Sequence, residues 1–159
     1  MNLNDKLKQI ALDDLEGMPL SFFDAYSRKN SETFNFLYSQ KILDNESIDA
    51  ALEKAVIKQA KNDYDFMLSV KHRVVYADHA GVPEYLAYAL DKKVFSEKEI
   101  KKIPFDHGQN AEIFVKDYLK KDLISSLRNT LLSPKPIIKY SKRTMAEYFS
   151  DSHPCCSCD

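Results

Sequence analysis

Residues 45–74 read NESIDAALEKAVIKQAKNDYDFMLSVKHRV, and this stretch decides the fold. Its apolar residues recur every three or four positions, at Ile48, Leu52, Ala55, Val56, Ala60, Tyr64, Met67, Val70 and Val74. Such spacing is typical of the buried face of an α-helix. Because no glycine or proline interrupts the chain before Gly81, we predict one long helix that ends between residues 78 and 81.

Two shorter elements are expected before this helix. Apolar residues keep helical spacing from Leu3 to Leu15, and Gly17 with Pro19 supplies a stop signal. The aromatic-rich residues 22–38 follow, and their bulk indicates core packing. Since Ser21, or Asn30 with Ser31, has the right chemistry for a helix cap, we predict one broken helix or two short helices there.

The chain after Gly81 also favours helices. Pro83 suits the first turn of a helix. Ser96 and Glu99 have the spacing of a capping box, and Pro104 and Gly108 end the element that they begin.

Asn110 is a suitable cap for a second long helix. Its apolar positions are Ile113, Val115, Leu119, Leu123, Ile124, Leu127 and Leu131. Ser133 and Pro134 end it, because proline removes an amide donor and restricts the preceding residue. We therefore predict an all-α compact bundle with two long helices and shorter aromatic-rich ones. Its domain covers residues 1–133, and residues 134–159 form a Pro/Lys linker, a short helix and a Cys-rich tail.

Composition excludes several classes of function. The 23 basic and 24 acidic residues are interspersed and give a net charge of −1, so no overall field attracts nucleic acid or an anionic membrane. No run is apolar enough to span a bilayer, and residues 1–6 lack the apolar core of a signal peptide. We expect a cytoplasmic protein without a membrane span, and no nucleic-acid partner.

All three cysteines lie in the last residues of the chain, at Cys155, Cys156 and Cys158, and His153 stands just before them. Thiolates and imidazole are ligands for Zn or Cu(I), so these four residues form a candidate soft-metal site. The same thiols are candidate targets for covalent modification by another protein. This layout, a recognition region followed by a short Cys segment, resembles ribosomally made precursor peptides.

We therefore expect a non-enzymatic helical binding module that recognises a protein partner, such as a modifying enzyme, and presents this tail to it. A surplus of aromatic side chains, nine Tyr and nine Phe, is suited to an interaction surface, and assembly into a homo-oligomer remains open.

An enzymatic alternative comes from Arg73 and His79, which are separated by five residues. The pair resembles the Arg-x(4–6)-His pattern of the helical HEPN ribonucleases. In that family the arginine steadies phosphate charge and the histidine exchanges a proton, with pairs from two subunits forming the site. Val74 stands where the family usually has a polar residue. Six positions of a helix turn the two side chains about 240° apart, so sharing one site requires a break between them.

Overall fold

The computed structural model describes residues 2–70, 82–106 and 108–134. Within these ranges every regular element is helical, which confirms the predicted all-α fold. The elements are α1 (Leu3–Gly17), the short 3-10 helix η1 (Leu20–Phe22), α2 (Phe23–Ser39), α3 (Asn45–Val70), α4 (Val82–Asp91), α5 (Glu97–Lys102), α6 (Ala111–Tyr118) and α7 (Leu123–Leu132).

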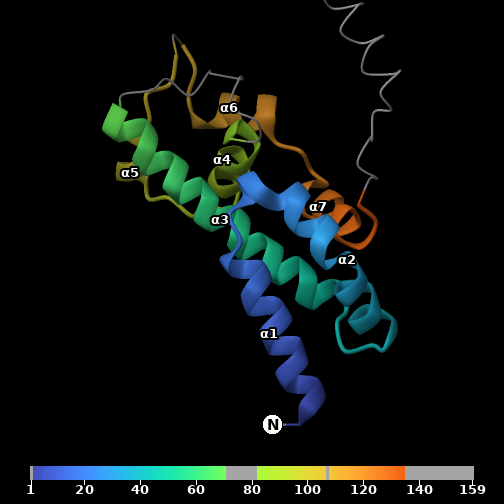
Figure 1. Ribbon diagram of the computed structural model, residues 1–159. Coiled ribbons are helices and arrows are strands. Elements are labelled where there is room, and N and C mark those ends of the chain that lie inside the picture. Colours follow the sequence, from blue (N-terminus) through green and yellow to red (C-terminus); the bar gives the residue numbers. More distant parts are fainter. Residues whose placement is uncertain (1, 71–81, 107, 135–159) are drawn as a thin grey trace, which may run out of the picture.

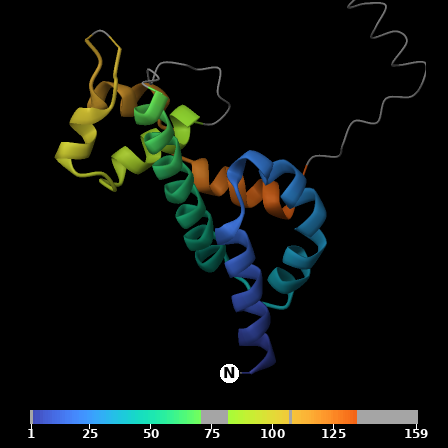
Figure 2. The same ribbon diagram turned by 60° about the vertical axis from the view of Figure 1, so that its left-hand side comes forward.

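Helix α3 is the long helix that the sequence predicts, and it runs through the centre of the molecule (Figures 1 and 2). Its N-terminal half packs against α1 and α7, and its C-terminal half packs against α4. The predicted end of this helix, between residues 78 and 81, lies outside the described residues.

The core has two parts along α3. The first apolar cluster lies between α1, α2, α7 and the start of α3, and it includes Leu15, Phe34, Leu52 and Leu131. The second apolar cluster gathers the end of α3 with α4, α6 and the residues around α5, and it includes Tyr64, Leu86, Phe95 and Phe114. Tyr85 and Leu119 pack against both clusters, so the two parts meet.

Polar caps fix the helix ends. The Asn2 side chain accepts a hydrogen bond from the Asp5 amide at the start of α1, and Gly17 ends that helix as predicted. Asp44 and Ser47 exchange two hydrogen bonds at the start of α3, and the one that the Ser47 amide donates to Asp44 Oδ1 lowers the pKa of the Asp44 carboxyl. Each cap satisfies amides that have no partner within the helix.

Three other predicted helix signals are confirmed. Ser96 and Glu99 form a capping box at α5, and the hydrogen bonds from Ser96 lower the pKa of Glu99. The Asn110 side chain accepts a hydrogen bond from the amide of Ile113 at 3.0 Å and so caps α6. Helix α7 ends at Leu132, directly before Ser133 and Pro134.

The aromatic-rich segment forms one continuous helix, so the predicted break within it is wrong. Neither of the expected internal caps acts as one. Asn30 instead donates a hydrogen bond to the Tyr26 carbonyl one turn earlier, at 2.9 Å, and Ser31 lies inside α2. Phe34 and Leu37 bury one side of this helix in the first cluster, and this packing compensates for the absence of a side-chain cap at its start.

The prediction of a second long helix is also wrong, because the segment from Asn110 to Leu131 divides into α6 and α7. Leu119 is extended, with ψ 120°, and a short turn separates the two helices. Phe114 is buried in the second cluster, whereas Leu131 is buried in the first. The break turns the chain so that both side chains reach a core.

Candidate functional site

The candidate residues that the sequence supplies lie outside the described ranges. His153, Cys155, Cys156 and Cys158 belong to residues 135–159, and Arg73 and His79 belong to residues 71–81. The metal site, the modification site and the ribonuclease pair therefore remain predictions. The same holds for the domain boundary between residues 133 and 134.

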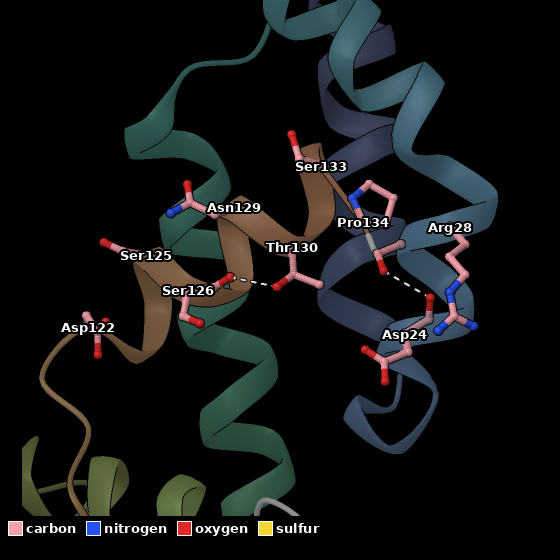
Figure 3. Close-up of a pocket in the computed structure, with 10 residues that line it drawn as sticks. Asp24, Arg28, Asp122, Ser125, Ser126, Asn129, Thr130, Ser133 and Pro134 are labelled. Carbon is pink, nitrogen blue, oxygen red and sulfur yellow. Dashed lines mark hydrogen bonds between the residues drawn. The ribbon is translucent and has the colours of Figure 1, made fainter. Parts of the chain in front are cut away.

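A polar groove of about 630 Å³ lies between α2 and α7 (Figure 3). Two helices supply its walls. It is lined by Asp24, Ser27, Arg28, Asp122, Ser125, Ser126, Asn129, Thr130, Ser133 and Pro134. Pro134 is also the residue from which the chain continues toward the cysteines.

A small buried side chain and a hydrogen bond between the two helices position the walls of this groove. Ser27 is 0% exposed, and its hydroxyl donates to the carbonyl of Asp24 at 3.0 Å, so it brings α2 close to α7 without an unpaired polar group. The Asn35 amide donates to the carbonyls of Ser31 and Leu132 at 2.8 and 2.5 Å, which ties α2 to the last turn of α7.

The α7 wall is a polar stripe. Its residues recur at intervals of three or four positions, as Ser126, Asn129, Thr130 and Ser133 do, and so lie on one side of the helix (Figure 3). The Thr130 hydroxyl donates to the Ser126 carbonyl at 2.9 Å. The amide of Asn129 has no such helix partner in the described residues and is suited to contact a ligand.

Charge in the groove is mixed. Asp24 and Arg28 stand on neighbouring turns of α2, and Asp122 stands at the start of α7. Arg28 is exposed and forms no ion pair with any described residue. Hydroxyls, an amide and charges of both signs suit an extended peptide, whose backbone and side chains offer the matching groups.

A second polar cluster, where α3 meets α4 and α7, is structural. The Arg128 guanidinium donates to Asp49 at 2.5 Å, and the Tyr88 hydroxyl donates to Glu53 at 2.5 Å. Burial and the Glu53 carboxylate raise the pKa of Tyr88, so the phenol stays protonated and neutral. These contacts join α3 to α4 and to α7.

In the described ranges, no three His, Cys, Asp or Glu side chains are placed to hold a metal ion. Likewise, none of the helices described combines the length and the apolar character needed to cross a membrane.

The fold and groove thus define the protein as an all-α helical bundle with a polar groove between two helices. Comparisons with known protein families, with curated proteins and with solved structures found no match.

Proposed function

We propose that the protein is a non-enzymatic binding module, whose α2/α7 groove holds a peptide segment of a partner protein while the C-terminal thiols are presented to that partner for covalent modification. The presented residues are His153, Cys155, Cys156 and Cys158. The observation that supports this proposal is the position of Pro134, which lines the groove and leads directly into the thiol-bearing segment.

The tether length fits this arrangement. Nineteen residues lead from Pro134 to His153. A chain of that length reaches up to about 60 Å when extended, which is enough to enter a cleft in a partner held at the groove. Holding the partner raises the local concentration of the thiols at its active site, so modification needs no strong contact with the tail itself.

Soft-metal binding is the second use of the same residues. Cys156 and Cys158 with His153 have the donor chemistry for Zn or Cu(I), and thiolates bind either ion once they lose their protons. A partner that loads the metal would use the groove in the same way.

Intact-mass spectrometry of protein from its native host, before and after a thiol reagent, tests the proposal. We expect an added or missing mass confined to the peptide that carries residues 150–159. A metal gives an added mass only under native conditions. An unmodified chain with three free thiols and no metal contradicts the proposal.

A matched pair of charge reversals tests the groove. Arg28 lines it, whereas Lys29 is an exposed neighbour on the same helix that does not. Arg28→Glu should abolish the mass change, and Lys29→Glu should leave it intact. Equal modification of both variants would show that recognition occurs elsewhere on the chain.

Deleting residues 150–159 separates this function from the ribonuclease alternative. The deletion should abolish the proposed function and spare any RNA cleavage by Arg73 and His79. Cleavage that is unchanged in His79→Ala eliminates the ribonuclease.

A further inference from the structure

Helix α1 exposes two large apolar side chains, Leu3 and Ile10, to solvent. Ala11 and Leu15 bury one side of the helix in the first cluster, but Leu3 and Ile10 are 69% and 67% exposed. Seven positions turn a helix through about 700°, so these two side chains lie within about 20° of one line. In Figures 1 and 2 the N-terminal end of α1 projects beyond the other helices.

The same exposed line carries a positive charge on one side of Ile10 and a negative charge on the other. Lys6 lies four positions before Ile10, and Asp14 lies four positions after it. Both side chains are exposed. The Tyr26 hydroxyl donates to Asp14 Oδ2 at 2.7 Å, which holds the carboxylate in place and leaves its other oxygen for a cation.

A hollow of about 390 Å³ lies beside Asp14, at the C-terminal end of this line. It is lined by Asp13, Asp14, Gly17, Met18, Pro19 and Tyr26. A Cβ built on Gly17 would meet no atom within 4 Å, so there is open space beside the backbone there. Gly17 lies seven positions after Ile10, as Leu3 lies seven before it.

We propose that α1 pairs antiparallel with α1 of a second copy of this chain, about a twofold axis at Ile10. In such a pair each residue faces the one equally far from Ile10 in the opposite direction. The two Ile10 side chains then meet at the axis, and Lys6 faces Asp14 of the second copy. Leu3 enters the hollow beside Gly17 of the second copy.

The line is complementary to itself under this symmetry, because Ile10 meets Ile10, Leu3 meets the hollow beside Gly17, and Lys6 meets Asp14. The parallel arrangement instead stacks Lys6 on Lys6 and Asp14 on Asp14. One helix pair gives an interface at the small end of the specific range, below about 1,200 Å² in total, so we expect a reversible, concentration-dependent dimer. This inference is independent of the function proposed for the groove.

Sedimentation velocity of the full chain over a concentration series tests the pairing. We expect a species of twice 18.3 kDa to grow with concentration. Ile10→Asp places two carboxylates at the axis and should abolish the dimer. Asn4→Asp adds the same charge at an exposed position about 120° from Ile10 around the helix and should leave it intact.

A charge exchange tests the register. Lys6→Asp or Asp14→Lys alone sets like charges against each other and should weaken the dimer at least tenfold, whereas the double variant should restore it. Circular dichroism confirms that each variant folds.

A symmetric disulfide tests the axis, in a chain whose Cys155, Cys156 and Cys158 are replaced by serine. Ile10→Cys should oxidise to a covalent dimer, and Asn4→Cys should not. A wild-type chain that stays monomeric at every concentration, or an Ile10→Asp variant that still dimerises, overturns the proposal.

Discussion

Two lysines take the backbone position that helices usually give to glycine. Lys41 and Lys93 have φ values of 60° and 58° at the ends of α2 and α4. In each case the following amide bonds a carbonyl five residues back, as Ile42 does to Leu37 at 2.9 Å. This is the Schellman arrangement, in which a side chain at the left-handed residue is strained.

Lys41→Gly and Lys93→Gly should therefore stabilise the protein. The left-handed conformation costs a non-glycine residue about 1–2 kcal/mol, and the extra freedom of glycine when unfolded offsets roughly half of that. We expect each variant to raise the free energy of unfolding by about 0.5–1 kcal/mol in urea titrations. Lys58→Gly, at an exposed site inside α3, should lower it by about 1 kcal/mol, and a gain there would contradict this explanation.

The α5 capping box makes stability depend on pH. The backbone and hydroxyl of Ser96 hydrogen-bond Glu99 and hold the pKa of its carboxyl below the ordinary value. The folded state thus favours the carboxylate. This stabilisation is complete above the unfolded pKa and is lost as the pH falls through the folded pKa.

Ser96→Ala keeps the amide that donates to Glu99 Oε1 but removes the hydroxyl, so it should raise the pKa of Glu99 part of the way toward its ordinary value and reduce the loss of stability in acid. An NMR titration of the Glu99 carboxyl measures the shift. Ser69→Ala, which removes a hydroxyl bonded to the Phe66 carbonyl, should leave that titration unchanged. A Glu99 pKa that does not move in Ser96→Ala would show that the Ser96 hydroxyl has no part in lowering it.

At the scale of elements, α7 is held to α3 by a partly buried ion pair. The Arg128 side chain is only 17% exposed, and Asp49 Oδ1 is buried without a hydrogen-bond partner. Removing the arginine would leave this carboxylate with neither its cation nor full access to water.

Arg128→Ala should lower the free energy of unfolding by roughly 1–3 kcal/mol. A double-mutant cycle with Asp49→Ala should give a coupling energy of about 0.5–3 kcal/mol. The pair of Lys54 and Glu16, at 3.3 Å, serves as the control because its lysine is 68% exposed, and it should couple by less than about 1 kcal/mol. Equal coupling in the two cycles would show that burial of the first pair has no effect.

The break between α6 and α7 has a signal in the sequence. Val115, Leu119, Leu123, Leu127 and Leu131 are spaced by four residues, and each such step drifts about 40° around a helix. Over the whole segment the drift reaches about 160°, so a straight helix would turn its two ends toward opposite sides. Because the chain breaks between α6 and α7, α6 can pack in the second cluster and α7 in the first.

The polar stripe on α7 is equally visible in the sequence, but its role as a groove wall is not. Ser126, Asn129 and Ser133 look like an ordinary solvated helix face. Only the placement of α2 beside α7, with Ser27 buried between them, makes that face one side of a cavity.

At the scale of the whole molecule, α3 passes through both apolar clusters and should make unfolding cooperative. Leu52→Ala in the first cluster should cost about 2–5 kcal/mol, and Phe114→Ala in the second about 3–5 kcal/mol. Each should shift one common transition, seen alike by circular dichroism and tyrosine fluorescence. Ile113→Ala, at the exposed neighbour of Phe114, should change stability by less than about 0.5 kcal/mol. Two separate transitions would show that the clusters unfold independently.

The sequence by itself determined the helical class, most helix ends and the position of the long central helix, because periodicity and caps act over a few residues. Tertiary structure alone decided which faces meet. It placed α2 beside α7, with the polar groove between them. It also divided the predicted second long helix into α6 and α7, which pack in different clusters, and it left Leu3 and Ile10 exposed to solvent. The physical reason is that burial depends on contacts between segments far apart in the chain, and local spacing does not specify those partners.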